Sequence, residues 1–300
     1  MCILAYAYLT ALLLLLFLPH GLGSGNYCKL SDCGENNLAC DNNGKFNAKC
    51  MPNTRVIPMT VYRSSLLSVL NEFRNSVASG QGKLRPAARM ARMSWSRELE
   101  HMAKLSAISC SMLKYCLSTE NFYYVGSIFD AFKYSGRLDE YEDYEIILNM
   151  VTDWTKRLAD ISLGMVIYMP DDIGDMRIIN AALLISEANT HVGCTAMRFP
   201  FSGFHHFVFV CAFSTDVFVQ RSLYKLTGKA GSACKRRDSK YPALCAPGER
   251  YHNDRRIPNA TLLVPTSDAK RQRNPELATF YNYHVYNYGE SQRSLSSIPI

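Results

Sequence analysis

The sequence carries an even set of ten cysteines behind an apolar leader, and this set constrains the fold more than any other feature. The ten are Cys28, Cys33, Cys40, Cys50, Cys110, Cys116, Cys194, Cys211, Cys234 and Cys245, while the eleventh, Cys2, lies in the leader. An even set of this kind is typical of a disulfide framework rather than of reactive thiols. Zinc binding is a weaker alternative, because the sequence has no Cys-x-x-Cys pair and no histidines at zinc-finger spacing.

Residues 1–25 have the pattern of a signal peptide. Residues 3–18 are almost wholly apolar, and the small residues Gly21, Gly23, Ser24 and Gly25 follow. The apolar run is short for a membrane span, although the missing Lys or Arg before it leaves an uncleaved anchor as an alternative. We expect cleavage at or just before Asn26. The mature protein would then be secreted and extracellular, without a transmembrane segment.

The formal net charge of +7 bears on the partners that such a protein could have. A basic secreted protein can bind acidic glycans or membrane surfaces. Because Lys and Arg are scattered among Asp and Glu, the sequence favours a mixed, solvated surface instead. A nucleic-acid partner is not expected in this compartment.

The mature chain divides into four parts by composition. Residues 26–55 form a cysteine-rich N-terminal extension, 56–224 one globular domain, 225–249 a C-terminal disulfide clasp, and 250–300 a polar tail rich in Tyr, Arg and Asn. We expect the tail to be disordered, because it has no apolar periodicity beyond Thr261-Leu262-Leu263-Val264.

Hydrophobic spacing within the globular part predicts helices first and strands last. Helical periodicity covers residues 64–78, 95–108 and 144–161. Strand-like alternation covers 191–199 and 206–213, with a turn over 200–205. This order, together with the cysteines, predicts a mixed α/β sandwich.

Five sets of segments, in order along the chain, carry a family resemblance. They are Tyr27-Cys28; 71–80 (NEFRNSVASG); 86–95 (PAARMARMSW) followed by Glu98-Leu99; 189–194 (NTHVGC) with 209–211 (FVC); and 231–234 (GSAC) with 241–245 (YPALC). Together they resemble the CAP superfamily of cysteine-rich secretory, antigen five and pathogenesis-related class 1 proteins, and within it the insect antigen five-related branch. The resemblance covers roughly residues 26–249. It implies a single disulfide-rich α-β-α sandwich domain and a monomer.

The resemblance also implies a disulfide pairing that the sequence alone leaves open. The implied pairs are Cys28–Cys40, Cys33–Cys116, Cys50–Cys110, Cys194–Cys211 and Cys234–Cys245. The first three would attach the N-terminal extension to the domain. Each bridge typically stabilises a fold by about 2–4 kcal/mol.

The family cleft carries two histidines and two glutamates, which hold a divalent metal in some members. The matching positions in this sequence are Leu70, Ser127, Arg157 and Asn180. The alkyl side chain of Leu70 cannot bind a metal or move a proton, and Arg157 would repel a cation. The resemblance therefore implies a degenerate cleft with no catalytic residue, no metal and no cofactor.

An alignment shifted by one residue near Gly126 and Arg157 would bring in the nearby carboxylates Glu120, Asp153 and Asp160 as alternative ligands. They lack the histidines that would complete a metal site.

Outside the cleft, three other features of the sequence bear on function. His205-His206 would point to opposite faces of a strand and could not share a metal. The sequence has no Gly-x-Ser-x-Gly nucleophile motif. Asn259-Ala260-Thr261 is an N-glycosylation acceptor in a secreted chain.

Two further motifs lie in the tail. Residues 270–273 (KRQR) are either a processing site or a solvated basic patch, and the latter is favoured. The aromatic residues 280–288 either dock a partner or form an unselected end.

The sequence thus predicts a non-enzymatic, venom allergen-like glycoprotein that binds an unknown extracellular protein in a body fluid. The alternative is a carrier of a small lipid or sterol, because Leu70, Ile128 and Leu183 would make the cleft apolar. The same residues could equally fill the cleft as core. A residual hydrolase ranks last, since no acid–base pair remains.

Overall fold

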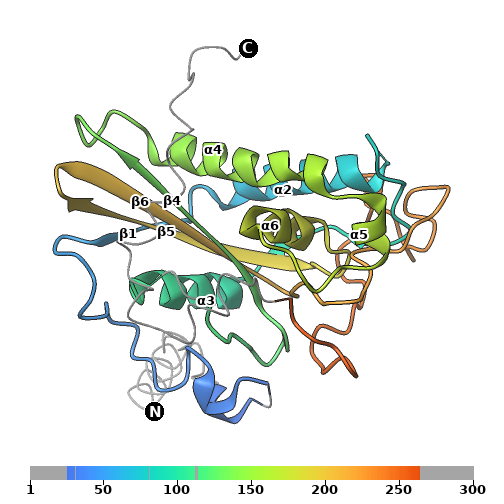
Figure 1. Ribbon diagram of the computed structural model, residues 1–300, viewed down its shortest axis with the longest axis horizontal. Coiled ribbons are helices and arrows are strands. Elements are labelled where there is room, and N and C mark those ends of the chain that lie inside the picture. The colour runs from blue at the N-terminus through green and yellow to red at the C-terminus, as the bar shows by residue number, and fades with distance from the viewer. Residues whose placement is uncertain (1–25, 31, 81, 112–113, 264–300) are drawn as a thin grey trace, which may run out of the picture.

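A five-stranded sheet forms the middle layer of the molecule, as the computed structural model shows for residues 26–30, 32–80, 82–111 and 114–263 (Figure 1). The path of the sheet is β1 (Arg55–Ile57), β5 (His191–Phe201), β6 (Phe204–Phe213) and β4 (Gly126–Tyr134), all antiparallel. The short strand β3 (Ser94–Trp95) adds to β5 in parallel. The expected signal peptide and the motifs at 270–273 and 280–288 lie outside the described residues.

Helices cover both faces of the sheet (Figure 1). One face carries α2 (Arg63–Ala78), α4 (Asp143–Lys156) and α6 (Met176–Ile185), with the short α5 (Leu163–Ile167) beside them. The other face carries α3 (Arg97–Ile108), which packs on β5 and β6. These layers confirm the predicted disulfide-rich α-β-α sandwich.

Short elements complete the described chain. The 3-10 turns η1 (Tyr27–Lys29) and η2 (Gly34–Asn36) lie in the extension, and η3 (Arg157–Asp160) follows α4. Strands β2 (Met90–Ala91) and β7 (Leu244–Cys245) pair in parallel and attach the clasp to the domain.

Alternation along β6 produces two cores, one on each side of the sheet. Phe207, Phe209 and Phe213 pack with the helices α2, α4 and α6. Val208 and Val210 point the other way and pack with α3. All five side chains are fully buried, and each contributes about 1.5–3 kcal/mol of hydrophobic stabilisation.

Five disulfides join the ten cysteines of residues 26–263: Cys28–Cys40, Cys33–Cys116, Cys50–Cys110, Cys194–Cys211 and Cys234–Cys245. These are the pairs that the resemblance implies. The second and third link the extension to the loop after α3, and the fourth joins directly opposed residues of β5 and β6. The fifth closes the clasp.

The prediction of a disordered tail is wrong for its first part, because residues 250–263 pack against the domain. Leu263 is fully buried, and its backbone N–H donates to the carbonyl of Val217. The backbone N–H of Tyr123 donates to the carbonyl of Asn253. A segment that supplies hydrogen bonds and a core side chain is folded, even though its composition is polar.

Several element boundaries also differ from the sequence-based expectations. Trp95 belongs to β3, because Ser96 ends that strand and caps α3 by accepting from the N–H of Leu99. The expected turn over 200–205 shrinks to Ser202 and Gly203, whose positive φ angles make a two-residue connection between β5 and β6. Among the described residues, no helix is long and apolar enough to cross a membrane.

Candidate functional site

Two of the four family ligand positions lie in the helical layer. Leu70 lies on α2 and is 1% exposed, in one buried cluster with Ile128 and Leu183. Asn180 lies on α6 and is 8% exposed. At these positions the helical layer therefore offers one amide and no imidazole.

The other two positions do not complete a site with them. Ser127 alternates with Gly126 and Ile128 along β4, so its side chain points to the opposite face of the sheet from Ile128. Arg157 begins η3, and its guanidinium binds the Asp160 carboxylate at 3.1 Å.

A divalent metal does not fit this set of side chains. Leu70 has no donor atom, Ser127 points away, and Arg157 is itself a cation. The three carboxylates weighed as substitutes do not repair the set, because Glu120 is exposed, Asp153 binds Lys156 at 2.6 Å, and Asp160 binds Arg157. We derive no metal chemistry at this position.

Potential ligand clusters elsewhere are also occupied by other bonds. Among the described residues, each group of three or more clustered Cys, His, Asp or Glu atoms contains at least one disulfide-bonded cysteine. A sulfur in a disulfide is not a thiolate ligand. These clusters therefore arise from the disulfide pairing and are not metal sites.

One carboxyl that the sequence did not single out lies on the same side of the sheet as Leu70. Asp130 on β4 accepts a hydrogen bond from the indole N–H of Trp154 at 2.8 Å and one from the backbone N–H of Ala131. Burial raises the pKa of Asp130 to about 6, against the lowering effect of these hydrogen bonds. The sequence predicts no strand over residues 126–134, because Asp130 and Lys133 interrupt the apolar alternation of that segment.

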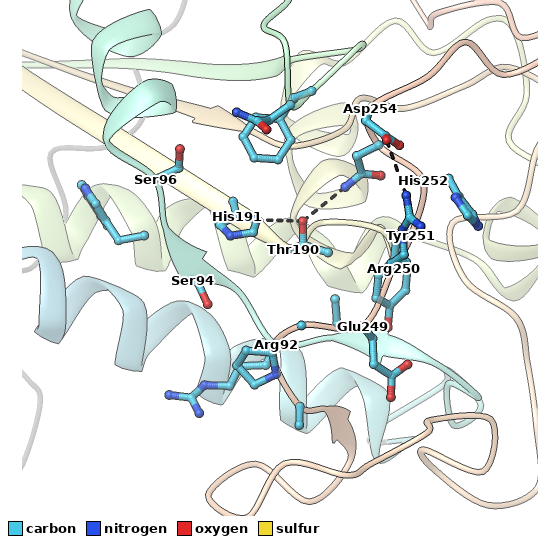
Figure 2. A pocket seen from close by; sticks show the side chains of 18 of the residues that line it. Arg92, Ser94, Ser96, Thr190, His191, Glu249, Arg250, Tyr251, His252 and Asp254 are labelled. Carbon is cyan, nitrogen blue, oxygen red and sulfur yellow. Dashed lines mark hydrogen bonds and ion pairs between the residues drawn. The ribbon is translucent and has the colours of Figure 1, made fainter. Parts of the chain in front are cut away.

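A polar pocket of ≈ 520 Å³ opens at the start of β5, beside the N-terminus of α3 (Figure 2). Its walls come from residues 91–98, 121–122, 190–191 and 246–254. Five of its nineteen lining residues, 250–254, belong to the segment whose composition predicts a disordered tail. The side chains of Thr190 and His191 lie centrally among the labelled residues (Figure 2).

Hydrogen bonds around Thr190 assign the tautomer of His191. The hydroxyl oxygen of Ser214 accepts from the backbone N–H groups of Thr190 and His191, at 2.9 and 3.0 Å. Its own proton therefore goes to the Thr190 hydroxyl, 3.2 Å away, which also accepts from the amide of Asn253 at 3.3 Å. The Thr190 proton is left to bind Nδ1 of His191 at 2.9 Å. This arrangement favours the tautomer of His191 that carries its proton on Nε2.

The assigned tautomer makes His191 a hydrogen-bond donor toward a ligand. Burial lowers the pKa of His191, which keeps the ring neutral at physiological pH. The ring of Phe122 packs against it with centroids 5.4 Å apart. Nδ1 already accepts a hydrogen bond from the Thr190 hydroxyl. The imidazole is therefore better suited to donate a hydrogen bond to an acceptor group of a ligand than to abstract a proton.

The remaining predicted sites lie apart from the pocket. His205 and His206 belong to β6 rather than to a turn, opposite Pro200 and Phe199. His205 reaches the carbonyl of Gly136 at 3.1 Å, whereas His206 is buried and stacks on Phe199. Asn259 is exposed, as a glycosylation acceptor must be.

Comparisons with known proteins agree with the sequence motifs. The family model for the cysteine-rich secretory protein family, CAP, matches residues 67–213. Venom allergen-1 of Aedes albopictus is 24% identical over 234 residues, covering 76% of this chain and 90% of that protein. Tablysin 15 of Tabanus yao is 29% identical over 224 residues, covering 73% of this chain and 86% of that protein.

A solved structure shows a weaker likeness. The crystal structure of NaASP2 with Zn2+ aligns with a TM-score of 0.47 at 21% identity, covering 65% of this chain and 99% of that chain. This likeness is too low for the zinc of that protein to bear on the present chain.

Proposed function

The chain belongs to the CAP superfamily, in its antigen five-like branch, and on that premise we propose that it is a secreted, non-enzymatic protein that acts by binding in an extracellular fluid. The disulfide pairing follows the family pattern, whereas the residues at the four ligand positions differ from those of the family. A chain that retains the disulfide framework but not the polar cleft is best explained as a protein that binds a partner through another surface or pocket.

The observation that carries this proposal is the burial of Leu70. Its side chain is 1% exposed and packs in the core cluster that also holds Ile128 and Leu183. A buried alkyl group at the first ligand position removes a ligand and leaves no polar side-chain atom there to hold an ion. The polar pocket around His191 offers hydrogen-bond donors and an aromatic wall instead, which are features of a ligand site.

Isothermal titration calorimetry with zinc and magnesium tests the proposal on the full secreted chain. We expect no stoichiometric binding at micromolar concentrations, and no difference between the wild type and Asn180→Ala. The matched control is His191→Ala, which leaves the cleft intact and removes an imidazole from the pocket. Stoichiometric binding that Asn180→Ala abolishes and His191→Ala preserves would overturn the degenerate-cleft interpretation.

A lipid or sterol carrier is the alternative function. Leu70, Ile128 and Leu183 are at most 2% exposed and pack in one cluster, so they fill the helical layer rather than line an open groove. Organic extraction of the purified secreted protein, followed by mass spectrometry, decides between the two. An empty extract is expected, whereas a stoichiometric lipid would favour the carrier.

A further inference from the structure

The positive charge of the chain is concentrated in its C-terminal part. Residues 221–256 contain ten Lys and Arg but three Asp and Glu, which makes this segment +7 and equal to the formal net charge of the whole chain. Residues 26–220 contain nineteen basic and twenty acidic residues and are almost neutral. All ten cations of the C-terminal segment are exposed. The expectation of a mixed surface is therefore wrong for this part of the molecule.

The fold places a second basic segment beside the first. Residues 82–97 contain five Lys and Arg and no Asp or Glu. The backbone N–H of Ala88 donates to the carbonyl of Lys225 at 2.8 Å, and the N–H of Thr227 donates to the carbonyl of Pro86 at 2.9 Å. Strands β2 and β7 continue this contact. Two acid-poor segments that are far apart in sequence thus form one surface.

We define the basic face by six exposed side chains: Arg85, Lys225, Lys229, Lys235, Arg236 and Lys240. The clasp segment that carries most of them, drawn in orange, gathers at the end of the sandwich opposite the β5–β6 turn (Figure 1). The Cys234–Cys245 disulfide closes the loop that holds Lys235, Arg236 and Lys240. Within the described part of the chain, none of the six forms an ion pair.

Two acidic residues of the clasp are neutralised by arginines that lie beneath this face. Asp238 is buried and binds Arg92 at 2.8 Å. The Glu249 side chain is 6% exposed and binds Arg89 at 3.1 Å. Both carboxylates therefore face arginines of the 82–97 segment. A third carboxylate, that of Glu187, lies beside Lys225 and accepts from its backbone N–H at 2.9 Å. Exposed cations therefore outnumber exposed carboxylates on the outer surface of the two segments.

We propose that the basic face binds a sulfated glycosaminoglycan chain. Guanidinium and ammonium groups on a disulfide-closed loop match the sulfate and carboxylate groups that such a polymer repeats. At physiological salt, charges interact over about 8 Å, so cations must be clustered to act together. This proposal rests on the proposed secretion, and it names the class of partner that the secreted protein meets.

A lipid membrane is the competing polyanion, and the distribution of apolar side chains argues against it. Interfacial membrane binding combines basic residues with apolar side chains that enter the bilayer. Every strongly exposed large hydrophobic side chain among the described residues lies outside 82–97 and 221–256. The face therefore offers charge without an apolar anchor, which suits a hydrated polysaccharide.

Heparin serves as the probe, and binding is measured by calorimetry on the full secreted chain over a series of salt concentrations. The test variant combines Lys225→Gln, Lys229→Gln, Lys235→Gln and Arg236→Gln. We expect this variant to bind heparin at least about tenfold more weakly near 150 mM salt, with a shallower salt dependence because fewer counterions are released.

The matched control removes the same charge elsewhere, by Lys29→Gln, Lys45→Gln, Lys49→Gln and Lys104→Gln, all at exposed positions. Binding within about threefold of the wild type is expected for it. Equal weakening of both variants would show an effect of net charge alone and overturn the site. Tighter binding to phosphatidylserine vesicles than to heparin would assign the face to a membrane instead. Either outcome leaves the zinc titration unchanged, so a failure here is distinguishable from a failure of the proposed function.

Discussion

Replacement of Arg74 by methionine would remove the side chain that holds the end of α6 to the rest of the fold. Arg74 lies on α2, is fully buried, and donates five hydrogen bonds to backbone carbonyls. Its acceptors are the carbonyls of Ala91, Leu184, Ser186 and Asn189. Two of these belong to the C-terminal end of α6, where helical carbonyls lack partners within the helix.

The size of the effect follows from those four acceptors. A buried polar group that loses its partner costs about 1–3 kcal/mol, so the low end of the range for four carbonyls is about 4 kcal/mol. Burial lowers the pKa of Arg74 to about 9, and the guanidinium is therefore still charged at neutral pH. Methionine recovers the cost of burying that charge, which is why we use the low end. A loss of about 4 kcal/mol is a large part of the usual 5–15 kcal/mol stability of a domain.

The assay is equilibrium unfolding in guanidinium chloride with the disulfides intact, comparing Arg74→Met with Arg137→Met. Arg137 is the matched control, because its side chain is 84% exposed and pairs with a similarly exposed Asp139. Arg137→Met should cost less than about 0.5 kcal/mol. The reasoning is refuted if Arg74→Met lowers the free energy of unfolding by no more than the control does.

Two further substitutions test the packing around the site. Asp130 has a folded pKa of about 6 against an ordinary value of 3.8, so its contribution to stability is full below pH 3.8 and is lost as pH rises through 6. Urea unfolding should therefore show Asp130→Asn to be more stable than the wild type by about 1–3 kcal/mol at pH 7.5, and the difference should shrink toward pH 4. A difference that does not depend on pH would contradict this prediction. A Cβ on Gly193 would lie 2.0 Å from the backbone nitrogen of Glu100, so the backbone would have to shift to relieve the clash. Gly193→Ala should therefore lower the melting temperature by at least about 2–8 °C. Gly174→Ala, which meets nothing within 4 Å, is its control and should leave the melting temperature nearly unchanged.

Local patterns in the sequence predict the central elements of this fold well. The run over 206–213 identifies β6 because both faces of that strand are buried and every side chain from Phe207 to Phe213 is apolar. The apolar spacing of Leu66, Leu70 and Val77 identifies α2 because one face alone meets the core. In both cases the period of the pattern matches the burial that tertiary structure imposes.

Elements without a one-sided pattern were missed for physical reasons. Helix α6 is buried at every position from Ile179 to Ile185, and this short, almost continuously apolar run is as typical of a buried strand as of a helix. In β4, Asp130 and Lys133 interrupt the alternation, and the indole of Trp154 supports the polar group at Asp130. That partner is 24 residues away in sequence and invisible to local reasoning.

The sites show the same division between local and long-range information. Leu70 could be recognised from a motif as a non-ligand, because chemistry alone excludes an alkyl group. The pocket at His191 and the basic face could not be predicted, because each depends on a late segment returning to lie beside residues 82–98. A segment that is polar in composition was assigned to a tail, although its hydrogen bonds place it in the fold.

Leu70 and its buried neighbours replace the polar cleft of the family and offer no ligands to a metal ion. X-ray diffraction at the zinc absorption edge, from crystals of the full-length protein grown with zinc, tests this. We expect no anomalous difference peak between Leu70 on α2 and Asn180 on α6. A strong peak there, with the Asn180 side chain among its ligands, would contradict it.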